Sequence, residues 1–176
     1  GTRAYVISEL QAIDETCKLG NYYKDSTGPF IYWIVGDSNS DVVFPGQIGA
    51  IGTKGYNNIS FVKVGTGTYT FTNNNNFITK LGLEVREGKA YINNDPTIRG
   101  MHTGGIGGPT RVTVNTVFGG TGRTGGNVEV YGKLEVGYYG IGTLLVADSL
   151  SVNPMSKYDT PVGYSFKYMG TNSKGR

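Results

Sequence analysis

The side chains that most often carry catalytic or metal chemistry are scarce in this sequence, which holds one histidine, His102, and one cysteine, Cys17. A nucleophilic triad needs an imidazole base, and His102 sits among glycines with no Gly-x-Ser-x-Gly motif in the chain. One histidine and one cysteine also fall short of the three or four ligands of a usual zinc site. We therefore expect His102 to be an ordinary surface residue, and we expect no catalytic residues, no metal and no cofactor.

Two further segments resemble known binding motifs only in part. The glycine-rich run at 119–126 lacks the Gly-Lys-Ser/Thr that opens a helix in a phosphate loop, and a strand pattern follows it. Asp37, Asn39 and Asp41 alternate as calcium ligands do, but the EF-hand positions for glycine and glutamate hold valine and isoleucine. We interpret the first segment as a loop between strands and the second as an Asx-rich turn.

The sequence contains enough acidic residues for glycoside hydrolysis. That reaction requires two carboxylates at a defined separation across one bond, and nothing in the sequence places two of them so. The candidates are Glu84, Glu87, Asp95, Glu129 and Glu135. Glu129 and Glu135 alternate with apolar residues, so the solvent-facing side of a strand explains both.

Tyrosine is the more informative residue type, since each ring combines an apolar face with a polar tip and can stack on a sugar while bonding its hydroxyls. The alternative is that tyrosine is simply a common aromatic of sheet surfaces. We select as candidate ligand-binding residues those beside glycine, asparagine or lysine: Tyr138, Tyr139, Tyr22, Tyr23, Asn74 and Asn75.

Strands must position these side chains, because 13 tyrosines, 29 glycines and only 16% charged residues are typical of an all-β protein. We predict an all-β fold, either a β-sandwich or a fibre-like β-rich domain, with one short N-terminal helix. Residues 1–176 are expected to form a single domain. A subdivision into a helix-plus-hairpin segment at 1–46 and a β-rich body at 47–176 is a further possibility.

The helix is predicted at about 9–19. Ser8 and Gln11 have the spacing of a capping box, and Gly20 stands where a helix often ends. Leu10 and Ile13 would share one face with Cys17, which we expect to be a small buried hydrophobe.

The rest of the chain is read as strands and turns. Residues 21–35 predict a β-hairpin whose second strand, near Phe30–Val35, is largely buried. The four asparagines at 73–76 predict a loop tip, because asparagine tolerates left-handed backbone and bonds locally.

Residues 127–153 show the clearest alternation, with apolar side chains at every second position and charged or polar ones between them. We read this stretch first as a pair of amphipathic hairpins. Its beginning repeats the pattern of Leu83–Ile92 with one residue fewer, at an offset of 45 residues. Two copies do not establish a repeat protein, but they indicate that the same hairpin or rung is used twice.

The net charge of +3 and the absence of any cluster of lysine and arginine give no support to nucleic-acid binding. No apolar run is long enough for a transmembrane helix, so we expect no membrane insertion. The N-terminal residues lack the pattern of a signal peptide, which has either been removed or was never needed. The lone cysteine cannot form an intrachain disulfide, which fits a protein assembled in a reducing cytoplasm.

Several phrases of the sequence resemble bacteriophage tail fibres and tailspikes. They are the segments at 7–13, 20–23 and 32–33, the Gly-Gly-Thr-Gly junction at 117–122, and the short strand phrases of 127–153. The resemblance implies a homotrimeric structural protein of the virion tail. Because the chain lacks the evident carboxylate pair of tailspike enzymes, we expect that it is not an enzyme. The resemblance also implies adhesion to a glycan or protein on the surface of a host bacterium.

Two alternatives stay open. A fimbrial or autotransporter-type adhesin at the cell surface, with a lectin domain, would share the β-rich surface, although fimbrial domains commonly carry a disulfide. A small glycan-active hydrolase would need acidic groups that converge on a groove. In every case we expect an extracellular or virion location.

Overall fold

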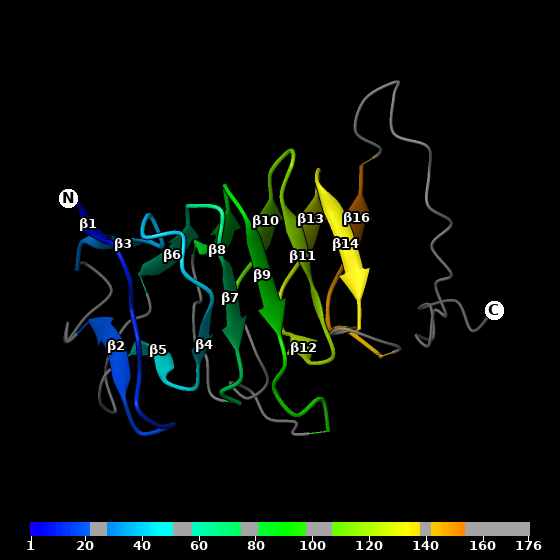
Figure 1. Cartoon of the computed structure of the whole chain (residues 1–176), viewed down its shortest axis with the longest axis horizontal. Helices are drawn as coiled ribbons and strands as arrows, with labels where there is room; N and C mark the ends of the chain where they lie inside the picture. The colour runs from blue at the N-terminus through cyan, green and yellow to red at the C-terminus, as the bar shows by residue number, and fades with distance from the viewer. Residues whose placement is uncertain (22–27, 51–57, 75–80, 98–106, 138–141, 154–176) are drawn as a thin grey trace.

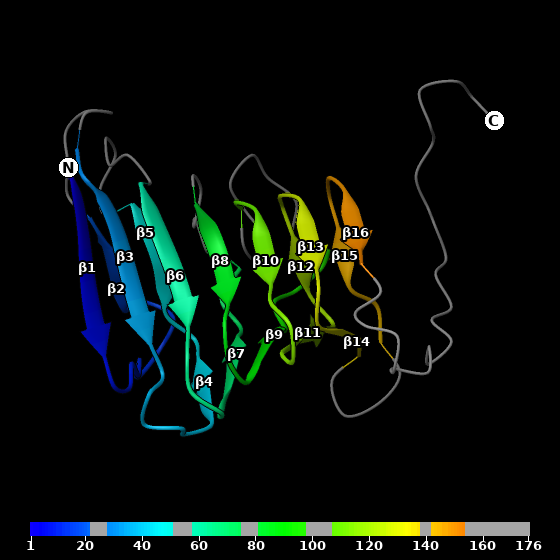
Figure 2. The same ribbon diagram turned by 90° about the horizontal axis from the view of Figure 1, so that it is seen from above.

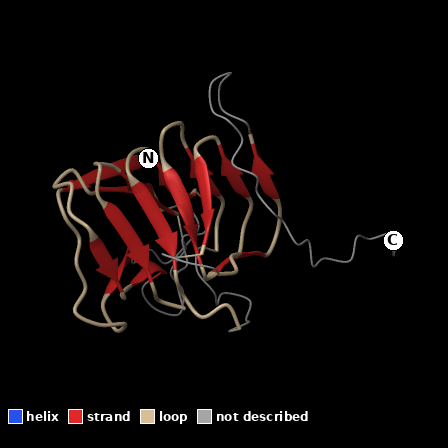
Figure 3. Ribbon diagram, turned by 45° about the vertical axis from the view of Figure 1, so that its right-hand side comes forward, coloured by secondary structure: helices blue, strands red, loops and turns tan. Residues whose placement is uncertain are grey.

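The computed structural model describes residues 1–21, 28–50, 58–74, 81–97, 107–137 and 142–153. Sixteen strands and no helix are found in these residues (Figure 3). The predicted all-β class is therefore confirmed, while the predicted N-terminal helix is wrong.

The strands form two main sheets whose paired strands all run parallel. Sheet 1 consists, in spatial order, of β1 (Thr2–Ile7), β3 (Phe30–Val35), β6 (Ile59–Lys63), β8 (Gly82–Val85), β10 (Thr110–Val112), β13 (Val128–Val130) and β16 (Leu150–Val152). Sheet 2 consists of β4 (Val42–Phe44), β7 (Thr68–Phe71), β9 (Lys89–Ile92), β11 (Val117–Gly120) and β14 (Lys133–Val136). Two smaller parallel pairs are β2 (Lys18–Asn21) with β5 (Gln47–Ala50), and β12 (Arg123–Thr124) with β15 (Leu145–Val146).

The chain visits these sheets in rotation, so the molecule is a parallel β-solenoid rather than a β-sandwich. In the first turn only β2, a strand of a small pair, lies between β1 and β3. Each later turn, or rung, runs from sheet 1 to sheet 2, and in some rungs through a small pair, before it returns to sheet 1 one strand further along. Figures 1 and 2 show the rungs stacked along the long axis of the molecule, with the strands of sheet 1 following one another from the N-terminal end. Neighbouring rungs thus lie one strand spacing apart, about 4.8 Å.

The segment predicted as a helix lies against the first rungs as an irregular stretch followed by β2. The Tyr69 hydroxyl accepts a hydrogen bond from the Leu10 N–H (2.8 Å) and donates one to the Leu10 carbonyl (3.0 Å). The Asp14 carboxylate accepts a bond from the Thr16 N–H (2.8 Å) and closes a local turn. These contacts occupy backbone groups that a helix would use, so the capping-box pattern is overridden. Cys17 is half-buried rather than buried.

The predicted hairpins are also wrong. Strand β3 pairs in parallel with β1 and β6, so it is not the second arm of a hairpin at 21–35. Strands β13 and β14 belong to different sheets, although only Tyr131 and Gly132 separate them. A short link between two amphipathic strands therefore turns a corner of the solenoid in this chain.

The repeated pattern is explained by equivalent positions on rungs two turns apart. Its members stack in two columns, Leu83–Thr110–Val128 on sheet 1 and Ala90–Phe118–Leu134 on sheet 2. The second copy of the pattern is one residue shorter because the corner after β13 is shorter than the corner after β8. Within 127–153, Val128, Val130 and Leu134 are buried as predicted, whereas Val136 and Leu150 are exposed on the last strands of their sheets.

Inward-facing side chains of successive rungs form the core. One column on sheet 1 contains Val35, Lys63, Val85, Val112 and Val130, all with 0% exposure. A cluster of aromatic rings fills the space between the sheets near the N-terminal end, with ring centroids 5.2–6.4 Å apart: Phe44, Phe61, Tyr69 and Phe71. Lys63 therefore occupies a position that valine fills on β3, β8, β10 and β13.

Asparagine side chains connect the rungs where the chain leaves sheet 2. Asn73, which was predicted to lie in a loop tip, is buried and donates to the Pro45 carbonyl (2.7 Å). The Asn94 amide oxygen accepts a bond from the Arg123 N–H (2.8 Å) on the next rung. These amides satisfy backbone groups that the sheet ladders leave unpaired.

Replacing Thr110 by valine is expected to raise the free energy of unfolding by about 1 kcal/mol. The Thr110 side chain is buried next to Leu83 and Val128, and its hydroxyl has no hydrogen-bond partner within the described part of the chain. The matched control is Thr116→Val, because the buried Thr116 hydroxyl donates to the Thr113 carbonyl (2.7 Å) and its loss should destabilise. Denaturant unfolding measures both, and a less stable Thr110→Val protein would contradict the prediction.

Candidate functional site

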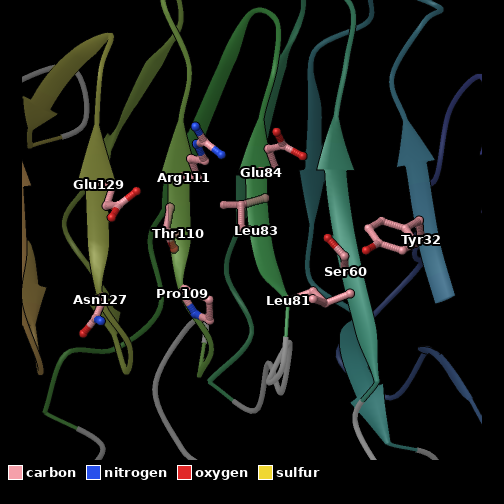
Figure 4. A pocket seen from close by; sticks show the side chains of 10 residues that line it. All are labelled: Tyr32, Ser60, Leu81, Leu83, Glu84, Pro109, Thr110, Arg111, Asn127 and Glu129. Atoms are coloured by element: carbon pink, nitrogen blue, oxygen red, sulfur yellow. The ribbon is translucent and has the colours of Figure 1, made fainter. Parts of the chain in front are cut away.

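A groove of about 330 Å³ lies on the face of sheet 1 that points away from the core. It crosses β3, β6, β8, β10 and β13, and therefore runs along the stack of rungs (Figure 4). Its lining residues are Tyr32, Ser60, Leu81, Leu83, Glu84, Pro109, Thr110, Arg111, Asn127 and Glu129.

The polar side chains of the groove result from strand alternation and parallel register. Glu84, Arg111 and Glu129 are direct register partners on β8, β10 and β13, and their sequence neighbours Val85, Val112 and Val130 point into the core. Successive members of this row are about 4.8 Å apart at their backbones. Figure 4 shows the three charged side chains side by side in one row.

The three charged side chains of this row differ in the partners that they contact. The Glu84 carboxylate forms an ion pair with Arg86 at 2.8 Å. The Arg111 guanidinium lies over the ring of Tyr131, 5.6 Å from its centroid. Among the described residues Glu129 has no ion-pair partner, although Arg111 is its register neighbour. Arg111 and Glu129 therefore keep open hydrogen-bonding positions toward the groove.

The remainder of the groove is less polar at one end. Tyr32 is half-buried beside the buried Ser60, its register partner, and the half-buried Leu81 lies below them (Figure 4). At the other end, the amide nitrogen of Asn127, in the orientation that satisfies its neighbours, donates to Asp148 (2.6 Å). An aromatic ring at one end of a polar row can offer a stacking surface and hydrogen bonds to the same extended ligand.

A second polar cluster lies on the outer face of sheet 2 and is internally satisfied. The Tyr91 hydroxyl bonds the Glu135 carboxylate across Gly119, and Lys133 pairs with the same carboxylate at 2.6 Å. Burial alone would raise the pKa of Glu135, but the hydrogen bonds from Lys133 and Tyr91, with the charges of Lys133 and Lys89, hold it below its ordinary value. This cluster has an evident structural use.

Most of the ligand-binding residues predicted from the sequence fall outside the described residues, namely Tyr22, Tyr23, Asn75, Tyr138 and Tyr139. Asn74 is described, and its amide oxygen accepts a bond from the Asp95 N–H (2.7 Å), so it connects two rungs. Its role in ligand binding stays a prediction.

Two residues of the calcium-like motif, Asn39 and Asp41, have structural uses. The Asn39 and Asp41 side chains accept bonds from the N–H groups of Thr66 (2.8 Å) and Thr68 (2.7 Å) on the next rung. Within the described ranges, no group of three or more histidine, cysteine, aspartate or glutamate side chains is placed to hold a metal ion. His102 lies outside those ranges.

Sequence reasoning missed Tyr32 and Arg111, while Glu84 and Glu129 were noted only as two of several acids. The repeated pattern held a usable signal, because Leu83-Glu84-Val85 and Val128-Glu129-Val130 occupy equivalent positions of their rungs. Two such glutamates must face the same side of one sheet once the repeat is recognised as a rung.

Comparison with protein-family models and with curated proteins finds no match for this chain. In the described part of the chain, no helix has the length and hydrophobicity that crossing a bilayer requires. The groove and the solenoid that carries it are therefore the observations on which a function is proposed.

Proposed function

We propose that the chain is a non-enzymatic, receptor-binding structural protein of the bacteriophage tail-fibre or tailspike type. In this proposal it forms a homotrimer in the virion tail and attaches to a glycan on the surface of a host bacterium. The groove on the outer face of sheet 1 is the attachment site.

The observation that carries the proposal is the position of the groove along the stack of rungs. A row of polar side chains repeats at the strand spacing of about 4.8 Å, and Tyr32 provides an aromatic surface at one end. This arrangement suits an elongated ligand made of similar units rich in hydroxyl groups. The parallel ladders, which lock every rung to its neighbours, also suit a protein that must transmit force along its axis.

The proposal is tested first by binding. The purified chain is presented with a panel of bacterial surface polysaccharides, and retention is measured by biolayer interferometry. We expect at least one polysaccharide to be retained, with binding weakened about tenfold in Tyr32→Ala, since one aromatic stacking contact is removed. Tyr5→Ala is the matched control, because Tyr5 is a partly exposed tyrosine of sheet 1 that does not line the groove.

Failure of the whole panel to bind, or equal loss in both variants, would overturn the proposed site. Release of new reducing ends during incubation would favour a glycan-active hydrolase instead. Light scattering tests the assembly separately, and a monomer at micromolar concentration would count against the trimer.

A further inference from the structure

The charge arrangement in the groove bears on the kind of glycan that can bind, and the inference that follows rests on the proposed function. The negative charge of Glu84 is neutralised within the protein by the ion pair with Arg86. Arg111 and Glu129 stand next to each other with opposite charges. The groove thus presents no excess of positive charge that would attract an acidic polymer.

Arg111 and Glu129 are unusual because they are register partners that do not form an ion pair. The Arg111 guanidinium is directed over the Tyr131 ring, and the Glu129 carboxylate has no ion-pair partner among the described residues. A donor fork and an acceptor carboxylate are therefore held on adjacent strands, about 4.8 Å apart at the backbone. Sugar hydroxyls both donate and accept, so neighbouring hydroxyls of one unit can bond both groups at once.

An acidic polysaccharide is disfavoured by the same groups. A carboxylate or phosphate placed on Arg111 would lie beside the Glu129 carboxylate, which has no ion-pair partner among the described residues, whereas Glu84 on the other side is paired with Arg86. Asp148, which accepts a bond from Asn127, adds a further acid at that end of the groove. Like charges at this separation oppose binding.

We infer that the groove selects an uncharged polysaccharide, laid along the stack of rungs, and that Arg111 and Glu129 together determine this selectivity. Arg111 donates to hydroxyl oxygens of a sugar unit, and Glu129 accepts from a neighbouring hydroxyl. Tyr32 contacts the apolar face of a sugar unit further along the polysaccharide.

The test compares uncharged polysaccharides (mannan, galactan and dextran) with acidic ones (polygalacturonate and polysialic acid), on the same sensor and at low and high salt. We expect uncharged polymers alone to bind, with an affinity that changes little between 50 and 500 mM salt, since no net charge is neutralised. Glu129→Gln should weaken binding about tenfold by removing one charged hydrogen bond. Glu129→Arg should create binding to the acidic polymers. Lys18→Gln, on β2, is the control and should bind as the wild type does.

The outcomes separate the inferred selectivity for uncharged polysaccharides from the proposed function. Retention of acidic polymers alone by the wild type overturns the selectivity and leaves the proposed function standing. Unchanged binding of uncharged polymers by Glu129→Gln, with wild-type circular dichroism, also overturns the role of Glu129. Retention of neither class overturns the proposed function itself.

Discussion

Replacing Gly65 by alanine is expected to lower the free energy of unfolding by about 3 kcal/mol or more. Gly65 lies in the corner between β6 and β7 with a φ of +74°, where an L-residue with a side chain is strained. An added Cβ would stand only 1.9 Å from the Gly36 carbonyl oxygen of the preceding rung. Backbone atoms cannot rotate aside as a flexible side chain can, so the rungs would have to separate.

The stacking of three glycines explains why this corner cannot adjust. A Cβ on Gly36 would meet the Val64 carbonyl oxygen at 2.4 Å, and a Cβ on Gly88 would meet the Gly65 carbonyl oxygen at 2.4 Å. Corners of three successive rungs are therefore in direct backbone contact. Denaturant unfolding measures the effect, with Gly1→Ala as control because nothing lies within 4 Å of its added Cβ. A loss below 1 kcal/mol for Gly65→Ala would show that the corners are not tightly stacked.

The same corners show why strands could be predicted from the sequence while their pairing could not. Alternation of apolar and polar residues defines the two faces of a strand, and it correctly indicated Phe30–Val35 and the strands near Leu83 and Val128. It does not specify the partner strand. The link at Arg86–Gly88, with glycine at positive φ, has the composition of a hairpin turn but directs the chain to the other sheet.

The candidate site depends on information that local patterns do not contain. Glu84 and Arg111 are neighbours only because parallel register places residues from different rungs side by side. Loops of variable length separate the rungs, so no fixed spacing in the sequence announces this contact. The N-terminal segment was mispredicted for a related reason, since the Tyr69 hydroxyl that binds Leu10 lies 59 residues away in the chain.

Alternation along its strand correctly places the Lys63 side chain in the core, although the residue type suggests a surface position. Its ammonium group donates to the carbonyl oxygens of Val64 (2.6 Å), Gly65 (2.7 Å) and Glu87 (3.4 Å). The ring of Tyr69 lies 5.9 Å away. The lysine stem thus extends the valine column, while its charge satisfies carbonyl groups of two successive corners.

Replacing Lys63 by methionine is expected to destabilise the protein by roughly 2 kcal/mol at pH 7, because buried carbonyl oxygens lose their donor. The gap between wild type and variant should widen as the pH rises. Burial lowers the pKa of Lys63 from 10.5 to about 8, against the opposing charges of Glu87 and Asp41. Below pH 8 the amine is charged in both the folded and the unfolded state, and the cost of burying the charge is fully present.

Between pH 8 and 10.5 the folded amine loses its proton while the unfolded amine keeps it, so the unfolded state binds more protons and wild-type stability rises with pH relative to the variant. We expect a relative gain of roughly 1–2 kcal/mol between pH 8 and 9.5, since a difference of one bound proton changes the free energy of unfolding by about 1.4 kcal/mol per pH unit.

Denaturant unfolding of both proteins from pH 7 to 9.5 measures the difference, and stopping there limits the titration of Tyr69, whose pKa is raised by burial. Lys18→Met, at an exposed lysine of β2, is the control and should give a constant difference. A Lys63→Met gap that stays constant up to pH 9.5 would mean that the fold does not favour the neutral amine, since a folded-state pKa at or above 10.5 changes stability only at higher pH. The carbonyl oxygens would then offset the cost of burying the charge.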